Sequence, residues 1–406
     1  MNANLLDLLV ARLAEHYVAL PQAAAVDLIV SDDPQYSRRF VLGRVVEMRR
    51  LPDEGSGFEG AVTANSFGNT SGKTSAADLP QAATRITTTY AVLAAMLADP
   101  TGFDARSAAV LQLGGVRIEG AARLAAYWLQ LLKRPSDEGR AALSRARERA
   151  PHWLDAVSVF EAAHINHERA PTVSPDTAIA TALDRSVPLH LRGVLRWPET
   201  AWTLTDWRKH EASTVLRMNP ANGQPQSVGT FIDALETPEA PEAPGSNTAA
   251  EPPYTEGCLL PAAWEARFEM PVLSAPMFGP AQLWFGRRRE HALVTRLHCD
   301  LANSFLAQVH GRKRVRLYSP SQDEVVYAFD AFNTYRPCRV DAAAPDLARF
   351  PRFAEARGVD VVIEPGDLLV IPTGWFHCVW ALDHVLSISR FVSEAQAAAL
   401  ASHLRI

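Results

Sequence analysis

The sequence predicts an α+β protein, with a mainly helical N-terminal domain over residues 1–170 and a small β-barrel domain over residues 171–406. Ala-rich segments with helical spacing precede the boundary, and strand-like runs separated by glycine and proline follow residue 280. A chain of 406 residues exceeds one ordinary domain, and a hydrophobic content of 48% is sufficient for packed cores. We therefore expect two domains.

Helices are predicted across the N-terminal domain. Residues 5–20 have apolar positions at helical spacing and end before a proline. Three Ala-rich helices are expected after it, at residues 87–98, 105–132 and 138–167. Residues 39–50 fit a strand or a helix, and the pattern does not decide between them. A packed scaffold is the favoured role of this domain, with a homodimer interface and a substrate-presenting cap as alternatives.

Two motifs in the N-terminal domain resemble binding sites. The segment Gly68–Thr74 lies in a long loop and has three residues between its glycines, whereas a phosphate-binding loop needs four and a preceding strand. Glu161, His164 and His167 have helical spacing, but no further metal ligand follows at close range. We interpret the first as loop and the second as surface polar residues.

The second domain begins with a short helix at Ser174 and a strand over residues 187–194. Residues 236–254 are acidic, rich in proline and almost devoid of large apolar side chains. Such a segment cannot bury enough surface to offset its ordering entropy. We expect it to be a flexible insertion.

A candidate metal site lies in the strand-like runs of this domain. Side chains alternate in a strand, so His298 and Asp300 point to one face while Cys299 points to the other. A second strand, entered through the turn at Gly366, can bring His377 beside them if the sheet closes into a barrel. Two imidazoles and one carboxylate on one side of a metal leave positions open, as in non-haem Fe(II) oxygenases.

The surroundings of these residues carry a family resemblance. The strand that follows Asp300 and the segment Gly311-Arg312-Lys313-Arg314 lead into another strand. Residues 283–391 resemble the cupin-like branch of the Jumonji C family of 2-oxoglutarate oxygenases, of the factor inhibiting hypoxia-inducible factor type. The resemblance implies a double-stranded β-helix (cupin or jelly-roll) barrel, with Fe(II) as cofactor and 2-oxoglutarate as co-substrate. It further implies that His298, Asp300 and His377 are the metal ligands.

The same resemblance assigns Lys313 and Thr295 to the distal carboxylate of 2-oxoglutarate. Alternation supports Lys313 independently, because it shares a face with the apolar residues two and four positions further on, while the neighbouring arginines share the other face. Parity does not support Thr295, since an odd separation from His298 in a regular strand puts the two on opposite faces. The assignment of Thr295 therefore follows from the resemblance alone.

Arg390 is a further candidate. In the closing strand, Leu386, Ile388 and Arg390 share a face, and the two apolar residues indicate the barrel interior. A guanidinium placed inward must be paired. It either binds a carboxylate of 2-oxoglutarate or of the substrate, or forms a structural ion pair with Asp383 or Glu364. We weigh these alternatives equally.

Composition limits the partners. The net charge of −5 and the pI near 6.2 argue against a nucleic-acid partner. Four cysteines without CxxC spacing predict a reduced, cytoplasmic protein, and no apolar run reaches the length of a membrane span.

Together the candidate metal site and the family resemblance imply a dioxygenase that hydroxylates a C–H bond and releases succinate and CO2. A peptide or protein side chain and an amino-acid-like small molecule are both open as substrates. The alternative is a barrel that keeps its metal only as a binding module, and Lys313 argues against it.

Overall fold

The structure is a computed structural model that describes residues 5–20, 22–51, 84–107, 110, 114–161, 173–219, 223–237, 252–289 and 291–404. The chain forms two compact units. The N-terminal unit comprises Met1–Ser136, Met218–Gln224 and Asp330–Thr334, and the C-terminal unit comprises Asp137–Arg217, Pro225–Phe329 and Tyr335–Ile406. The division between the units follows Ser136, whereas the predicted boundary was at residue 170, which lies outside the described residues. The segment Gly68–Thr74, His164 and His167 also lie outside the described residues.

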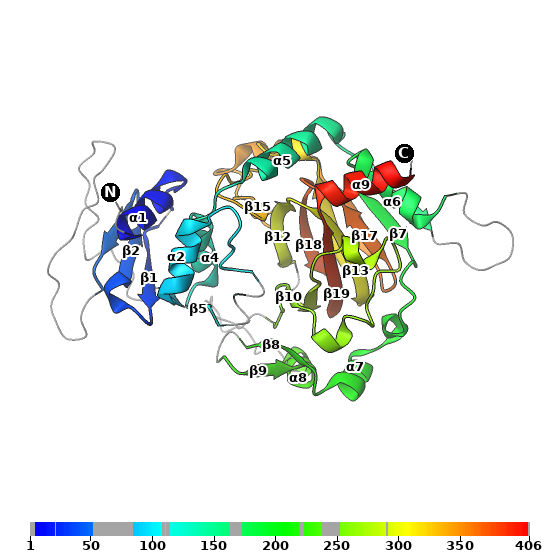
Figure 1. The fold of residues 1–406 in the computed structure, drawn as a ribbon, viewed down its shortest axis with the longest axis horizontal. Coiled ribbons are helices and arrows are strands. Elements are labelled where there is room, and N and C mark those ends of the chain that lie inside the picture. The colour runs from blue at the N-terminus through cyan, green and yellow to red at the C-terminus, as the bar shows by residue number, and fades with distance from the viewer. Residues whose placement is uncertain are drawn as a thin grey trace. The chain divides into compact units, whose positions relative to one another are not determined.

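The N-terminal unit contains a five-stranded sheet in the order β3-β2-β1-β4-β5 (Figure 1). Its strands are β1 (Ala24–Val30), β2 (Arg38–Leu42), β3 (Val46–Arg49), β4 (Thr84–Thr88) and β5 (Val116–Glu119). Only β1 and β4 pair in parallel among these strands. Its helices are α1 (Leu5–Glu15), α2 (Tyr90–Ala98) and α4 (Ala122–Gln130), with the short 3-10 helix η1 (Pro34–Tyr36). Helix α1 packs beside β3, and α4 packs across β1, β4 and β5.

The α+β class is confirmed, but the sheet of the N-terminal unit was not predicted. Strands β2 and β3 occupy residues 39–50, which the pattern left open. The helix expected over residues 105–132 is present only as α4, and β5 precedes it. The sequence Val-Arg-Ile-Glu of β5 alternates apolar and charged residues, but a run of four is too short to outweigh the Ala-rich surroundings.

The C-terminal unit contains a seven-stranded sheet in the order β10-β11-β19-β13-β17-β7-β6 and a five-stranded sheet in the order β15-β12-β18-β14-β16. The first consists of β6 (Ser158–Glu161), β7 (Leu189–Arg192), β10 (Cys258–Leu259), β11 (Gln282–Gly286), β13 (Asn303–His310), β17 (Leu368–Ile371) and β19 (Val385–Val392). The second consists of β12 (Leu293–Asp300), β14 (Lys313–Tyr318), β15 (Tyr335–Pro337), β16 (Val359–Ile363) and β18 (Phe376–Ala381). Strands β8 (Val215–Met218) and β9 (Pro225–Ser227) form a separate hairpin.

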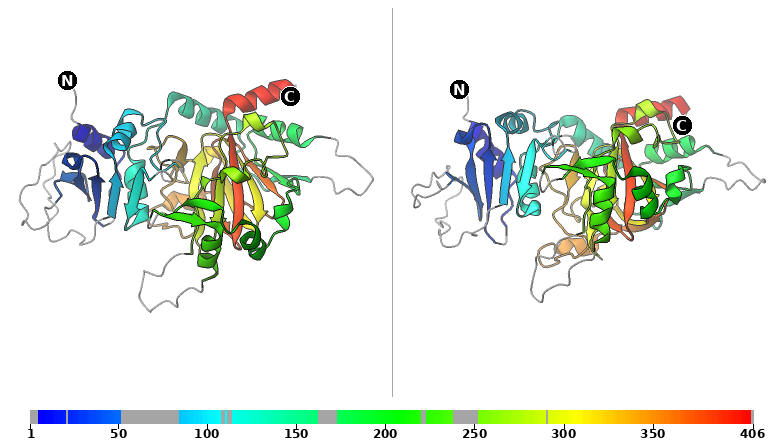
Figure 2. Two further views of the ribbon diagram at one scale, coloured as in Figure 1. Left: turned by 60° about the horizontal axis from the view of Figure 1, so that its bottom comes forward. Right: turned by 90° about the horizontal axis from the view of Figure 1, so that it is seen from below.

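Helices of the C-terminal unit are α5 (Asp137–Arg149), α6 (Pro175–Asp184), α7 (Leu204–Glu211), α8 (Val228–Glu236) and α9 (Glu394–Leu404). Short 3-10 helices are η3 (Pro198–Ala201), η4 (Ala262–Trp264), η5 (Ala275–Met277), η6 (Pro320–Gln322) and η7 (Pro351–Glu355). The predicted helix at Ser174 is confirmed as α6. The Ser174 side chain caps its N-terminus by accepting a hydrogen bond from the backbone N–H of Thr177. Helices α6 and α9 lie side by side (Figures 1 and 2).

The two sheets of the C-terminal unit face each other across an apolar core, which gives the expected double-stranded β-helix. Residues of both sheets share this core, among them Leu306, Leu369, Val315 and Val379. We call the faces that contribute to it the inner faces. The outer face of the seven-stranded sheet packs on a second core with the helices, and the outer face of the five-stranded sheet packs on a third core formed with residues 325–356.

No helix within the described part of the chain is both long enough and apolar enough to cross a membrane.

Candidate metal centre and co-substrate pocket

Three predicted ligands meet on the inner face of the five-stranded sheet. His298 and Asp300 lie on β12, and His377 lies on β18 directly opposite His298 in the strand register. Their ligand atoms all lie within 4.8 Å of one another, and among the described residues they form the one group of three or more His, Cys, Asp or Glu side chains with metal-binding geometry. An Asp300 carboxylate oxygen lies 3.6 Å from His298 Nε2, and the other lies 3.8 Å from His377 Nε2.

Backbone carbonyls orient both imidazoles. His298 Nδ1 lies 2.7 Å from the carbonyl oxygen of Arg296, and His377 Nδ1 lies 3.1 Å from that of Trp375. A carbonyl only accepts, so each Nδ1 carries the proton and donates it. Each Nε2 therefore keeps a free lone pair directed at Asp300, which is the tautomer that a metal requires.

Burial sets the charge state of the ligands. It lowers the pKa of His377 to about 3, with a smaller contribution from the charge of His298, so this imidazole is neutral at physiological pH. Burial also raises the pKa of Asp300, and His298 opposes this shift. A carboxylate that is costly to ionise without a partner, beside the neutral imidazole of His377, is suited to a divalent cation, which compensates the negative charge.

Thr295 lies on the same face as His298, contrary to the parity argument. From Leu293 to Thr295, and again from Thr295 to His298, β12 advances one residue more than β18 does. Thr295 is thereby opposite Val379 and His298 is opposite His377, two residues away on β18. Residues two apart in a strand share a face, so the bulges return Thr295 to the inner face. The position implied by the resemblance fits this register.

Lys313 lies on the inner face, as alternation predicted. Its exposed fraction is 2%, and Val315 and Leu317 on the same face belong to the inner core. On the other face of β14, Arg316 pairs with Asp360 and Arg314 stacks on Trp380. Burial lowers the pKa of Lys313 to about 7. A buried ammonium of this kind is a receptor for an anion.

Tyr254 completes this pocket and was missed by sequence reasoning, which placed it at the end of a flexible insertion. Its exposed fraction is 3%, and Lys313 Nζ donates to its hydroxyl oxygen over 3.2 Å. Burial raises its pKa, and a side-chain hydrogen bond with Thr295 opposes the shift. The Tyr254 hydroxyl thus bridges Lys313 and Thr295. One feature of the sequence points weakly to Tyr254: it is the first large apolar side chain after a run of small residues.

Arg390 does not point into the barrel, and the prediction that it does was wrong. Leu386 and Ile388 belong to the core on the outer face of the seven-stranded sheet, so Arg390 also faces outward. Its Nη2 donates to a carboxylate oxygen of Glu265 over 2.5 Å. The structural ion pair is therefore present, but with Glu265 in place of Asp383 or Glu364.

Replacing Arg390 by methionine should leave the dissociation constant of 2-oxoglutarate at its wild-type value. It should lower the free energy of unfolding by about 1 kcal/mol, the upper end of the range measured for partly exposed ion pairs. Chemical denaturation and co-substrate titration measure the two effects. Arg312→Met is the matched control, because its pair with Asp383 is exposed on both sides and its loss should not change stability measurably. A raised dissociation constant for 2-oxoglutarate in Arg390→Met would show that Arg390 contributes to co-substrate binding.

The residues present fit both groups that the resemblance implies. Two imidazoles and one carboxylate are the donor set of mononuclear non-haem Fe(II) sites. The buried Lys313 ammonium, with hydroxyls of Tyr254 and Thr295 beside it, fits a carboxylate at the end of a short dicarboxylic acid. The arrangement is a double-stranded β-helix with a candidate metal centre and, on the same inner face, a buried ammonium that can receive an anion.

The cupin-like domain family matches residues 182–395, just over half of the chain, and this protein belongs to that family. The resemblance to Jumonji C proteins is likewise confirmed. The chain is 40% identical over 106 residues to lysine-specific demethylase 8 of Xenopus tropicalis, a match covering 26% of this chain and 23% of the relative. It is 40% identical over 98 residues to tRNA wybutosine-synthesizing protein 5 of Danio rerio, covering 23% and 28%. It is 35% identical over 106 residues to lysine-specific demethylase JMJ30 of Arabidopsis thaliana, covering 26% and 24%. The matched segment spans about a quarter of these relatives.

Proposed function

We propose that this protein is an Fe(II)- and 2-oxoglutarate-dependent dioxygenase that hydroxylates a C–H bond. The observation that carries the proposal is the pairing of a His298, Asp300 and His377 centre with a buried cation, Lys313, on the same inner face. A binding module has no need of a desolvated ammonium on the sheet face that carries its metal ligands. The relatives, two lysine-specific demethylases and one tRNA wybutosine-synthesizing protein, support oxygenase chemistry in general.

In this proposal His298, Asp300 and His377 hold Fe(II) and leave the remaining positions to the co-substrate and O2. Iron bound there would supply the chemistry that couples the decarboxylation of 2-oxoglutarate by O2 to the insertion of one oxygen atom into a C–H bond, with succinate, CO2 and a hydroxylated compound as products. Lys313, Tyr254 and Thr295 receive the distal carboxylate and so orient the other end of 2-oxoglutarate toward the metal.

The inner core contributes by excluding water. Val315, Leu317 and Val379 belong to the apolar core on the same inner face as Lys313, so a charge-assisted hydrogen bond of Lys313 acts in a low-dielectric environment. The same surface keeps bulk water away from the reacting centre.

Succinate release tests this function. Purified protein with Fe(II), ascorbate and 2-oxoglutarate should release succinate slowly without substrate and faster with peptide, amino-acid or metabolite libraries. The stimulating compound should gain one oxygen atom by mass spectrometry. Iron binding with no succinate under any condition would instead favour the binding module.

The substrate class stays open between a peptide or protein side chain and an amino-acid-like small molecule. A nucleic-acid substrate is disfavoured by the net charge of −5. A cytoplasmic location and a homodimer stay predictions.

A further inference from the structure

A hydrogen bond from the turn before His377 connects the candidate metal centre to the end of helix α6. The indole Nε1 of Trp375 donates to the backbone carbonyl oxygen of Ser186 over 2.8 Å. Trp375 is fully buried and belongs to the inner core. Its own carbonyl oxygen accepts the Nδ1 proton of His377 at 3.1 Å. The same residue therefore makes both contacts, one through its side chain and one through its backbone.

Ser186 presents its carbonyl from an unusual backbone conformation. Its φ of 50° lies in the left-handed region, which residues other than glycine rarely adopt. The Ser186 N–H donates to the carbonyl of Leu183 over 3.1 Å, and the Val187 N–H donates to that of Ala182 over 2.9 Å. These two bonds form the Schellman pattern that ends a helix, here α6. Ser186 is 2% exposed, so its carbonyl needs a donor from the protein.

Strand pairing fixes the backbone of His377 but does not include the carbonyl of Trp375. Strand β18 begins at Phe376, which pairs with Tyr318 of β14, so Trp375 lies just outside the ladder. Among the described residues, two further hydrogen bonds reach residue 375. Its backbone N–H donates to the carbonyl of Pro372 over 3.2 Å, and its indole donates to Ser186. Only the indole bond ties Trp375 to an element outside its own turn.

The carbonyl of Trp375 decides which nitrogen of His377 faces Asp300. A neutral imidazole that donates its proton from Nδ1 keeps the lone pair of Nε2 for a metal. If residue 375 could rotate, His377 would lose this acceptor, and the other tautomer and other ring orientations would become populated. A ligand already held in the productive orientation loses less conformational freedom when the metal binds.

We propose that Trp375 is a positioning residue for His377. Its indole is anchored on the carbonyl of Ser186 at the end of α6, and it thereby holds the backbone carbonyl that fixes the tautomer and the ring orientation of His377. The proposal rests on the proposed function only for the presence of a metal at this centre. It assigns a role in metal affinity to the N–H group of a tryptophan in the core.

The competing explanation is that Trp375 contributes packing alone. A fully buried indole in the inner core fills volume, and its loss would lower stability wherever it lay. The two explanations differ in the N–H group, which packing does not require. They also differ in His377, which a general loss of stability does not single out.

Cobalt binding to the full-length chain without co-substrate tests the proposal. Trp375→Phe keeps an aromatic ring in the core and removes the donor. Its dissociation constant for Co(II) should rise roughly tenfold, the lower end of the range for loss of an outer-shell partner. Trp264→Phe is the matched control, because Trp264 is also fully buried and its Nε1 donates to Glu211 over 2.8 Å in the core on the outer face of the seven-stranded sheet. Its Co(II) constant should stay at the wild-type value.

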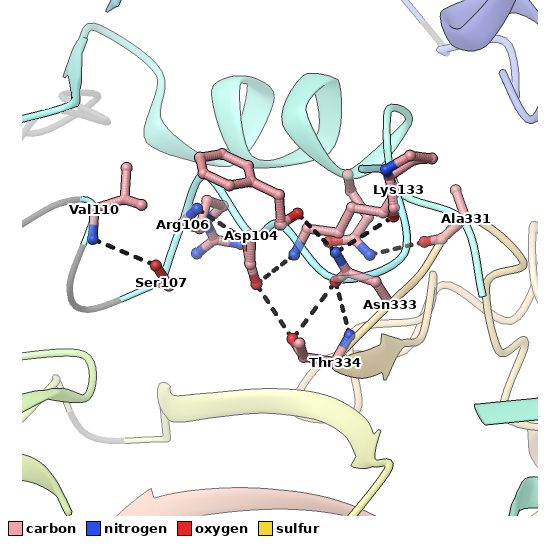
Figure 3. Close-up of polar contacts among 11 residues, drawn as sticks. Asp104, Arg106, Ser107, Val110, Lys133, Ala331, Asn333 and Thr334 are labelled. Carbon is pink, nitrogen blue, oxygen red and sulfur yellow. Dashed lines mark hydrogen bonds and ion pairs between the residues drawn. The ribbon is translucent and has the colours of Figure 1, made fainter. Parts of the chain in front are cut away.

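Lys133→Met is a second control, for loss of a buried polar contact in the N-terminal unit. Lys133 is 3% exposed, and its Nζ lies 2.7 Å from a carboxylate oxygen of Asp104. Figure 3 shows the two side chains directed at each other. Both residues belong to the N-terminal unit, whereas the candidate metal ligands belong to the C-terminal unit. This variant should therefore lose stability and keep the wild-type Co(II) constant.

Ser186→Gly separates positioning from stability. Glycine keeps the backbone carbonyl and adopts the left-handed conformation without strain, so the melting temperature should rise by about 2–4 °C while the Co(II) constant stays unchanged. In the double variant with Trp375→Phe, the melting temperature should recover in part while the Co(II) constant stays raised. The Ser186→Gly background also carries the measurement if Trp375→Phe alone does not fold.

Nitrogen-15 NMR of the metal-free chain reads the tautomer of His377 directly. The chain has 12 histidines, and His377→Gln assigns the signal that matters. Wild type should show the Nδ1–H form of His377, and Trp375→Phe should show a mixture of the two neutral tautomers. Trp264→Phe should match wild type.

An unchanged Co(II) constant or an unchanged His377 tautomer in Trp375→Phe would overturn the proposal. An equal loss of Co(II) affinity in Trp264→Phe or Lys133→Met, or its recovery in the double variant, would also overturn it, because stability would then be the cause. Wild type that binds no Co(II) would instead contradict the metal centre. The tautomer of the metal-free chain would then decide the positioning role alone, and the Nε2–H form in wild type would refute it.

Discussion

Replacing Asp300 by alanine should abolish the visible charge-transfer band that Fe(II) and 2-oxoglutarate form without oxygen. It should weaken Fe(II) binding by more than about 100-fold, since loss of an outer-shell partner alone costs 10–100-fold. The metal-free variant should melt no lower than metal-free wild type, because burial raises the pKa of this carboxyl and its ionisation is a cost to the empty fold. Anaerobic absorption, iron titration and calorimetry measure the three quantities.

Cys299→Ala is the control for this experiment. Cys299 lies between two of the ligands on the same strand, but its side chain is buried in the core on the outer face. The variant should keep the band and lose thermal stability, the reverse of Asp300→Ala. His298→Gln and His377→Gln should lose the band as Asp300→Ala does. A band that survives in all three ligand variants would show that the metal is held elsewhere.

Local sequence rules were enough to place two of the three candidate ligands on one face and to direct Lys313 inward, whereas His377 needed the barrel that the family resemblance implies. Alternation along one strand fixes the common face of His298 and Asp300, and alternation along β14 fixes the inward direction of Lys313. These inferences need no knowledge of the partner strands. They hold because residues two apart in a regular strand share a face wherever that strand lies.

Features that depend on a partner strand were not predictable in this way. The bulges that return Thr295 to the inner face are defined only by the register against β18. Tyr254 contacts Lys313 although the two residues are 59 positions apart in the chain. No local periodicity reports either relation.

Arg390 illustrates a different limit. Two apolar neighbours on its face correctly indicated burial, but the seven-stranded sheet is covered by apolar cores on both faces. A hydrophobic pattern then identifies a buried face without telling which of two cores it joins. Strand β5 of the N-terminal unit poses a related problem, because the alternation of its four residues is too short to compete with Ala-rich flanks.

Replacing Lys313 by methionine should weaken 2-oxoglutarate binding while Fe(II) affinity stays near wild type. The lost interaction is a charge-assisted hydrogen bond worth about 1.5–3 kcal/mol, which corresponds to roughly 10–150-fold in the dissociation constant. Arg314→Met is the matched control, because Arg314 is the next residue of the same strand and stacks on Trp380 on the outer face, with its guanidinium 4.1 Å from the ring centroid. A wild-type dissociation constant in Lys313→Met would remove this residue from the pocket.

The pH dependence of 2-oxoglutarate binding distinguishes the contribution of the Lys313 charge to affinity from the contribution of its side-chain volume. Burial lowers the pKa of this lysine to about 7, and the groups around it are the Tyr254 hydroxyl and, over the Tyr254 ring, the guanidinium of Arg288. A bound carboxylate favours the ammonium, so above pH 7 binding must be accompanied by uptake of a proton. The affinity of wild type should therefore fall as the pH rises above 7, by up to about tenfold per pH unit, which is the limit for one linked proton. Lys313→Met carries no titrating group at this position, so its weaker affinity should stay flat over the same range. Parallel pH profiles for the two proteins would mean that some other group supplies the charge that binds the distal carboxylate.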